Sequence, residues 1–147
     1  HDAAQQPRAP RDIPEVHAAV EQHRVPAEGG PRILSLSRLS PEKGIDVLLD
    51  AFAQLRADYP QAHLEIAGSG DLASELQAQA QRLNLGESVT FSGFVNPIEA
   101  MGRSDMIVQL SVWENCSYTL LDAKAAGLKT VATAVGGTRR FWAPTSW

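Results

Sequence analysis

Residues 110–137 read LSVWENCSYTLLDAKAAGLKTVATAVGG, and we interpret the rest of the chain as a scaffold for this stretch. The apolar run that leads into it, residues 105–110, has the length and composition of a short strand. Ser117 is a suitable N-cap for a helix, because leucines and alanines recur after it at helical spacing. Residues 129–133 are short and β-branched, which predicts a parallel strand, and Gly136-Gly137 forms a turn at its end.

This unit gathers candidate ligand-binding groups at one edge of a sheet. Ligands of open parallel sheets bind outside the carboxyl ends of the strands, where Glu114 and the amides of residues 115–118 fall. A helix N-terminus there attracts phosphate, because its first N–H groups lack partners and its dipole is positive at that end. The carboxylates of Glu114 and Asp122 suit sugar hydroxyls, so the simplest ligand is a phosphorylated sugar. The alternative is that both are solvated residues of a loop and a helix.

Two cations precede this unit and fall at the same edge. Residues 32–37 predict the first strand, which delivers Arg38 to its carboxyl end. Lys43 ends the following loop, before an amphipathic helix that runs to about Tyr59. A guanidinium binds a diphosphate in a bidentate way, and an ammonium supplies a mobile charge. Taken alone, the two residues favour the alternative that they are ordinary surface charges.

A glycine-containing turn follows the second predicted strand, residues 62–67. Gly68, Gly70 and Ala73 fit the pattern of two glycines and a small residue found in dinucleotide sites, which admits a nicotinamide-dependent oxidoreductase. Close packing between a helix and the sheet explains the same small residues. A short third strand, residues 89–91, leads to Phe94, which is a core candidate when it is considered alone.

The predicted elements alternate between strand and helix along the chain, which places the protein in the α/β class. Right-handed crossovers then give a Rossmann-like, doubly wound parallel sheet of five strands with a three-layer α/β/α arrangement. Residues 1–30 read as a polar linker with a short helix, and residues 31–147 as the domain proper.

Composition limits the function classes further. A chain of 147 residues is long enough for one domain, and its net charge of −4 argues against a nucleic-acid partner. Cys116 is the single cysteine, so no internal disulfide forms, and a reducing, cytoplasmic compartment is expected. No apolar run approaches the roughly 18 residues that a membrane span requires.

The stretch from Glu114 to Gly137 resembles the donor-binding signature of retaining glycosyltransferases of the GT-B class, family 4 (glycosyl transferases group 1). That signature is Glu, seven residues, an acidic residue, a helix of small residues, a strand and Gly-Gly. Here Asp122 is the second acidic residue, where the family usually has Glu. The likeness covers the chain from about Ile33 to Gly137, so the chain is similar to the C-terminal, donor-nucleotide-binding domain of such enzymes.

Three further motifs occur in the order that the family has them. Residues 37–44, SRLSPEKG, resemble the family's Gly-Arg-Leu loop that ends in Lys-Gly, with Ser37 where glycine is usual. The Gly-Ser-Gly turn at residues 68–70 is similar to the family's second-strand turn, which borders the donor pocket. The segment at residues 93–95 matches the place where the family's backbone faces the nucleobase. Ordered agreement of four motifs is more specific than any one of them.

The resemblance implies roles for individual residues. Arg38 and Lys43 would hold the donor diphosphate and stabilise it as the leaving group, and Glu114 would bind hydroxyls of the donor sugar; these three are the catalytic candidates. Asp122 would contact the ribose. The full set of donor-binding candidates is Gly68, Gly70, Phe94, Val95, Asn115, Cys116, Ser117, Tyr118, Thr119, Leu120 and Asp122. No metal and no resident cofactor is implied, since a nucleotide diphosphate sugar is the co-substrate.

The resemblance also implies what lies outside this chain. Transfer of the sugar, with retention, would go to an acceptor sugar or lipid-linked glycan held by a separate N-terminal domain, in bacterial polysaccharide, lipopolysaccharide or glycoconjugate synthesis. The chain alone would then be inactive, and its domain would be truncated after Gly137. The full-length enzyme would be cytoplasmic, with peripheral association at the inner face of the membrane as a further expectation. The competing classes are a nicotinamide-dependent oxidoreductase and a noncatalytic nucleotide-binding or interaction domain.

Overall fold

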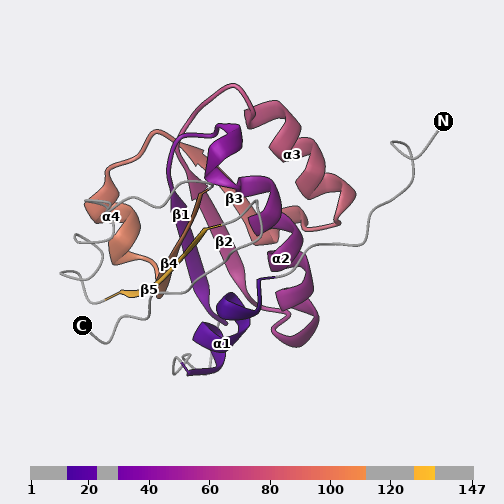
Figure 1. Cartoon of the computed structure of the whole chain (residues 1–147), viewed down its shortest axis with the longest axis vertical. Helices are drawn as coiled ribbons and strands as arrows, with labels where there is room; N and C mark the ends of the chain where they lie inside the picture. Colours follow the sequence, from indigo (N-terminus) through magenta and orange to yellow (C-terminus); the bar gives the residue numbers. More distant parts are fainter. Residues whose placement is uncertain (1–12, 23–29, 112–127, 135–147) are drawn as a thin grey trace.

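The structure of the protein, a computed structural model, describes residues 13–22, 30–111 and 128–134 (Figure 1). These residues form a parallel sheet with helices packed on both of its faces. The helices are α1 (Pro14–Gln22), α2 (Ile45–Asp58), α3 (Ala73–Arg82) and α4 (Pro97–Gly102), with short 3-10 helices η2 (Pro41–Lys43) and η3 (Gly86–Ser88). The strands are β1 (Arg32–Leu36), β2 (His63–Ala67), β3 (Val89–Gly93), β4 (Met106–Ser111) and β5 (Lys129–Ala134).

The five strands are parallel and lie in the order β3-β2-β1-β4-β5. The chain builds outward from β1 to β3 and then crosses to the other side of β1 for β4 and β5. This is the doubly wound arrangement that the sequence predicts, and the prediction is confirmed. The order reverses between β1 and β4, where doubly wound sheets open a crevice at their carboxyl ends.

Neighbouring residues of each strand point to opposite faces of the sheet, and residues on both faces are buried. Ile33 of β1 and Met106 of β4 are paired and belong to one buried cluster with residues of α1, α2 and α3. Leu34 and Ile107, the next pair, belong to a second cluster with residues of α4. Figure 1 shows α2 and α3 on one side of the sheet and α4 on the other. The three-layer α/β/α prediction is confirmed.

Helix α2 buries the apolar face that its sequence spacing predicts. Its buried apolar residues are Ile45, Leu48, Leu49, Ala51, Phe52 and Leu55. Full burial of a leucine-sized or phenylalanine-sized side chain contributes about 1.5–3 kcal/mol. This face therefore holds α2 against the sheet and fixes the β1–α2 connection that precedes it.

Helix α1 also belongs to the core, although it lies within the predicted 1–30 segment. Ile13, Val16, Ala19 and Val20 are at most 1% exposed and join the cluster that contains α2 and α3. The helix packs next to β5. The described part of the N-terminal segment is thus packed against the α/β domain.

Element boundaries shift by one or two residues from the sequence prediction, for local reasons. Ser37 is predicted as the end of the first strand and lies just beyond β1. Asp105 is predicted in the fourth strand, but β4 begins at Met106 because the carboxylate and the N–H of Asp105 both bond the backbone of Arg32, at 2.8 Å each. The predicted loop before α2 contains the 3-10 helix η2.

Candidate functional site

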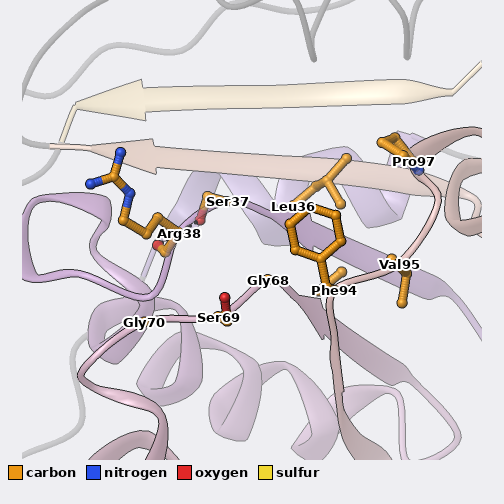
Figure 2. Close-up of a pocket in the computed structure, with 10 residues that line it drawn as sticks. Leu36, Ser37, Arg38, Gly68, Ser69, Gly70, Phe94, Val95 and Pro97 are labelled. Carbon is orange, nitrogen blue, oxygen red and sulfur yellow. Dashed lines mark hydrogen bonds between the residues drawn. The ribbon is translucent and has the colours of Figure 1, made fainter.

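A pocket of about 740 Å³ opens at the carboxyl ends of β1, β2 and β3 (Figure 2). The turn after β1 forms one wall, the turn after β2 lies opposite, and the segment after β3 closes the third side. We call it the strand-end pocket; its lining residues are Leu36, Ser37, Arg38, Ala67, Gly68, Ser69, Gly70, Phe94, Val95 and Pro97. Its volume lies within the range of about 300–1,000 Å³ typical of small-molecule sites.

Backbone hydrogen bonds join the three turns that form this pocket. The Ser37 N–H donates to the Ala67 carbonyl at 3.1 Å, and the Leu39 N–H donates to the Ser69 carbonyl at 2.9 Å. The Gly68 N–H donates to the Gly93 carbonyl at 2.7 Å and so ties the second turn to the third. These bonds pair main-chain groups that burial would otherwise leave unsatisfied, and they hold the pocket walls in one arrangement.

Gly68 and Gly70 are required by the close approach of the first two turns. Gly68 has φ +135°, and a Cβ there would lie 1.9 Å from the Ser37 carbonyl oxygen. A Cβ on Gly70 would lie 2.4 Å from the Leu39 carbonyl oxygen. Both distances are far below van der Waals contact, so a side chain at either position displaces backbone. Close packing therefore accounts for the glycine pattern that also admits a dinucleotide site.

The polar part of the pocket centres on Arg38, which is exposed at the end of β1 (Figure 2). Lys43 ends η2 and lies outside the set of residues that line the pocket. Between them, the Glu42 carboxylate accepts a hydrogen bond from its own backbone N–H and another from the Ser40 hydroxyl at 2.8 Å. These bonds, together with the positive charges of Lys43 and Arg38, lower the pKa of Glu42. This loop therefore carries a carboxylate as well as two cations.

The opposite end of the pocket is apolar and exposed to solvent at Phe94. Phe94 is 94% exposed, although an aromatic residue beside a strand is a core candidate, so that prediction is wrong. Val95 is partly buried against the cluster around α4. Asn96 caps α4 with its side-chain oxygen, which accepts from the N–H groups of Ile98 at 2.8 Å and Glu99 at 3.2 Å. The cap fixes where the Phe94–Val95 wall joins α4.

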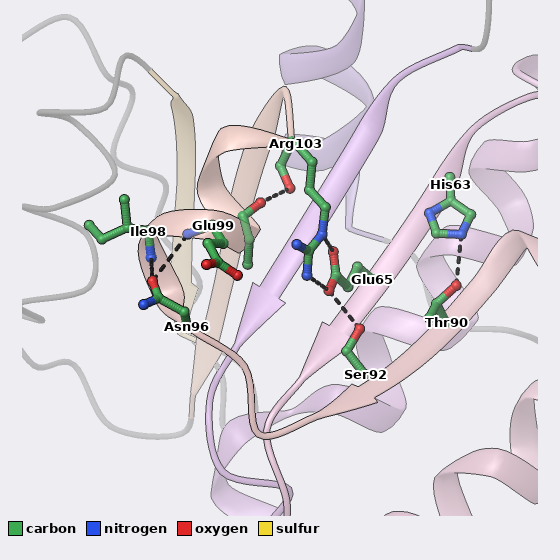
Figure 3. Close-up of polar contacts among 10 residues, drawn as sticks. His63, Glu65, Thr90, Ser92, Asn96, Ile98, Glu99 and Arg103 are labelled. Atoms are coloured by element: carbon green, nitrogen blue, oxygen red, sulfur yellow. Dashed lines mark hydrogen bonds and ion pairs between the residues drawn. The ribbon is translucent and has the colours of Figure 1, made fainter.

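An ion pair between a buried carboxylate and a half-exposed arginine fastens the other end of α4 to the sheet (Figure 3). Arg103, just after α4, donates to both carboxylate oxygens of Glu65 in β2, at 3.0 and 2.7 Å. Ser92 of β3 donates to the same carboxylate at 2.6 Å. The hydrogen bond from Arg103 is the main cause of the lowered pKa of Glu65, which is only 7% exposed. Cap and ion pair together position α4, and with it one wall of the pocket.

The structure brings five of the predicted site residues together, namely Arg38, Gly68, Gly70, Phe94 and Val95. Lys43 is described but lies outside the residues that line the pocket. The remaining predicted residues lie outside the described ranges: Glu114, Asn115, Cys116, Ser117, Tyr118, Thr119, Leu120 and Asp122. The binding roles of all of them stay predictions.

Sequence reasoning did not select five residues that line the pocket: Leu36, Ser37, Ala67, Ser69 and Pro97. A usable signal was present, since each lies within three positions of a predicted site residue at the end of a parallel strand.

The sequence model of the family described as glycosyl transferases group 1 matches residues 19–145. The chain belongs to this family. The matched range includes part of α1 and every other element that the structure describes.

Two relatives within this family show how much of a longer protein the chain represents. It is 34% identical over 108 residues to the alpha-monoglucosyldiacylglycerol synthase of Streptococcus pneumoniae, covering 71% of this chain and 24% of that protein. It is 32% identical over 119 residues to the mannosylfructose-phosphate synthase of Agrobacterium fabrum, covering 74% of this chain and 26% of that protein. The chain thus spans about a quarter of the length of these relatives.

Solved glycosyltransferase structures share the fold. The Anabaena protein HepE, crystallised with UDP and glucose, is 31% identical, with a TM-score of 0.64 over 71% of this chain and 29% of that one. The catalytic domain of the cholesterol-alpha-glucosyltransferase of Helicobacter pylori is 28% identical, with a TM-score of 0.60 over 69% of this chain and 63% of that one.

The described residues contain neither a cluster of metal-ligating side chains nor a membrane-spanning helix. Among residues 13–22, 30–111 and 128–134, no three His, Cys, Asp or Glu side chains are grouped so as to hold a metal ion. In the same ranges, no helix combines the length and apolar character needed to cross a membrane.

Proposed function

We propose that this chain is the C-terminal, donor-binding domain of a GT-B glycosyltransferase of family 4. The full-length enzyme would move a sugar from a nucleotide diphosphate sugar to an acceptor with retention of configuration. Membership of the glycosyl transferases group 1 and the HepE complex with UDP and glucose support a nucleotide-sugar donor. The alpha-glucosyl products in the names of two relatives support retention, because common glucose nucleotides are themselves α-linked.

The observation that carries this proposal is the composition of the strand-end pocket. An exposed arginine lies at one end, glycines border the middle, and an exposed aromatic ring lies at the other end (Figure 2). A nucleoside diphosphate has the same sequence of parts, with two anionic phosphates, a ribose and a planar base. In this assignment Arg38 binds the diphosphate in a bidentate way and Phe94 and Val95 border the base.

Catalysis in this proposal is mainly stabilisation of the leaving group. The bond between the anomeric carbon and the diphosphate oxygen breaks while the acceptor's hydroxyl oxygen forms a bond to that carbon. Negative charge develops on the departing diphosphate, which takes up the proton that the acceptor hydroxyl loses. Arg38, Lys43 and the amides after Cys116 would hold that charge in a preorganised site. Glu114 would orient the sugar hydroxyls and Asp122 the ribose. This chemistry uses neither a metal ion nor a resident cofactor.

The acceptor, in this proposal, binds to a part of the enzyme that this chain does not contain. The chain covers about a quarter of its relatives' length, so an acceptor domain fits in the remainder. One relative is named for a glucosyl lipid, which supports a lipid or lipid-linked acceptor. We further propose that the full-length enzyme is cytoplasmic and works at the inner face of the membrane. Bacterial glycoconjugate synthesis is the corresponding pathway class. In this proposal, the isolated chain binds the nucleotide-sugar donor but does not catalyse sugar transfer by itself.

An NMR titration of the isotope-labelled chain with UDP, GDP and ADP tests the donor assignment. One of them should shift the resonances of Gly68, Gly70 and Val95, while those of α3 stay in place. If none of the three nucleotides shifts these signals, this chain is not a donor domain.

Variants at the two ends of β1 then test the role of Arg38. Arg38→Ala should weaken nucleotide binding at least about tenfold, since a hydrogen bond to a charged group is lost. Arg32→Ala is the matched control, because Arg32 is also exposed and lies at the opposite end of the same strand. Equal affinities for the two variants would assign Arg38 to ordinary surface charge.

A further inference from the structure

We propose that the hydroxyl of Ser37 donates a hydrogen bond to a phosphate oxygen of the bound nucleotide, beside Arg38. This inference rests on the proposed donor-binding function and adds a residue to it. Ser37 lines the strand-end pocket, is partly exposed, and directly precedes the arginine assigned to the diphosphate. Figure 2 shows Ser37 and Arg38 together on one wall of the pocket, with Ser69 on the facing wall.

The backbone of Ser37 is held in place from two sides, so its side chain leaves the wall from a fixed point. Its N–H donates to the Ala67 carbonyl at 3.1 Å. Its carbonyl packs against Gly68 so closely that even one methyl group would not fit. The preceding carbonyl, of Leu36, accepts a hydrogen bond from the Gln109 side chain at 3.2 Å. A hydroxyl on such a rigid segment is preorganised, which lowers the entropic cost of binding.

The hydroxyl has only a poor partner within the described part of the chain. Its oxygen lies 3.3 Å from the carbonyl oxygen of its own neighbour, Arg38. Bonds between a hydroxyl and an oxygen acceptor are usually about 2.5–3.0 Å long, so this contact is weak. The proton is therefore available to a better acceptor that enters the pocket.

A phosphate oxygen is the acceptor that this position favours. Hydroxyl bonds to an anionic oxygen are shorter and about twice as strong as those between neutral groups. The Arg38 guanidinium, one residue away, draws an anion to this wall of the pocket. A neutral sugar hydroxyl would gain less from that charge than an anionic oxygen does, and the ribose and base extend toward Phe94 in the assignment above. Ser37 and Arg38 thus form a two-residue phosphate contact at the end of β1.

Ser37→Ala tests this contact, because it removes the hydroxyl and keeps the Cβ. For the 147-residue chain, we expect its affinity for UDP, measured by NMR titration, to fall about tenfold. Its affinity for uridine, which has the same base and ribose without phosphate, should stay within about twofold of the wild type. Ser74→Ala is the matched control, since Ser74 is exposed on α3 and outside the pocket. It should leave both affinities unchanged.

The outcomes distinguish failure of the hydrogen bond between Ser37 and phosphate from failure of the proposed donor-binding function. Equal UDP affinity for Ser37→Ala and the wild type refutes the contact and leaves the donor assignment standing. A parallel loss for UDP and uridine also refutes it, because the substitution has then changed the pocket rather than removed a phosphate ligand. If the wild type binds UDP weakly, the same comparison is made with GDP and guanosine or ADP and adenosine. A wild-type chain that binds no nucleotide overturns the donor assignment itself.

Discussion

Gly68→Ala should destabilise the fold strongly, for two reasons that the structure separates. The φ of +135° is a conformation that non-glycine residues adopt at a cost of about 1–3 kcal/mol. The added Cβ would also lie 1.9 Å from the Ser37 carbonyl oxygen, and forcing an extra carbon into packed structure costs about 1–3 kcal/mol. The two costs together predict a loss of about 2–6 kcal/mol. That is a large fraction of the roughly 5–15 kcal/mol that stabilises a typical domain.

Three other glycines provide controls that isolate each cause. Gly86 has φ +52° with no described atom within 4 Å of an added Cβ, so Gly86→Ala should cost about 1–2 kcal/mol from backbone strain alone. Gly70 lacks the strained φ but would place its Cβ 2.4 Å from the Leu39 carbonyl oxygen, so Gly70→Ala should cost about 1–3 kcal/mol from crowding alone. Gly102 has neither problem, and Gly102→Ala should be neutral or stabilising by up to about 1 kcal/mol.

Urea denaturation of the wild type and the four variants measures these differences. A loss of 1 kcal/mol lowers the Tm of a chain of this size by roughly 2–4 °C, so thermal melts offer an independent check. We expect Gly68→Ala to be the least stable variant, followed by Gly70→Ala and Gly86→Ala, with Gly102→Ala at or above the wild type. If Gly68→Ala costs no more than Gly86→Ala, the turns after β1 and β2 do not approach each other as described.

Three further predictions concern α4 and the walls of the pocket. Asn96→Ala should cost about 1 kcal/mol in urea denaturation by removing the α4 cap, whereas Asn96→Asp, which keeps an acceptor oxygen for the same N–H groups, should retain most of that stability; equal losses for the two variants would contradict the cap. Glu65→Gln should lower stability at neutral pH. Because the pKa of Glu65 is depressed in the folded state, the stability that its carboxylate contributes is lost as the pH falls below 4.5. The Tm values of the variant and the wild type should therefore converge at low pH, and a constant difference in Tm would contradict the ion pair. Phe94→Ala should leave the Tm unchanged, since the ring is 94% exposed, but should weaken nucleotide binding, and unchanged affinity would remove Phe94 from the base site.

The layout of the fold could be predicted from sequence because the spacing of apolar residues and the positions of turn-forming residues indicate the same elements along the chain. The spacing of Leu48, Leu49, Phe52 and Leu55 predicts the buried face of α2, and the structure shows it. Short β-branched and apolar runs predict the strands to within one or two residues. The ends differ because they depend on contacts with distant residues, as between Asp105 and Arg32.

The site could be predicted only where strand topology determines it. Arg38, Gly68 and Val95 follow strands that end at one edge of the sheet, so their proximity follows from strand order alone. The salt bridge between Glu65 and Arg103 joins residues 38 positions apart, and no local pattern signals it. Phe94 shows the opposite error, because hydrophobicity suggests burial and the ring is exposed. A single exposed apolar residue carries no periodic signal.

The links between the turns after β1, β2 and β3 have a consequence for how this family can diversify. They run from amide to carbonyl, so exchanging a residue's side chain leaves them intact wherever the new residue can adopt the local φ. Outside the two crowded glycines, substitutions can therefore change what the cavity recognises while the backbone that surrounds it keeps its arrangement. A common frame of this kind suits a protein family whose members handle chemically different sugars.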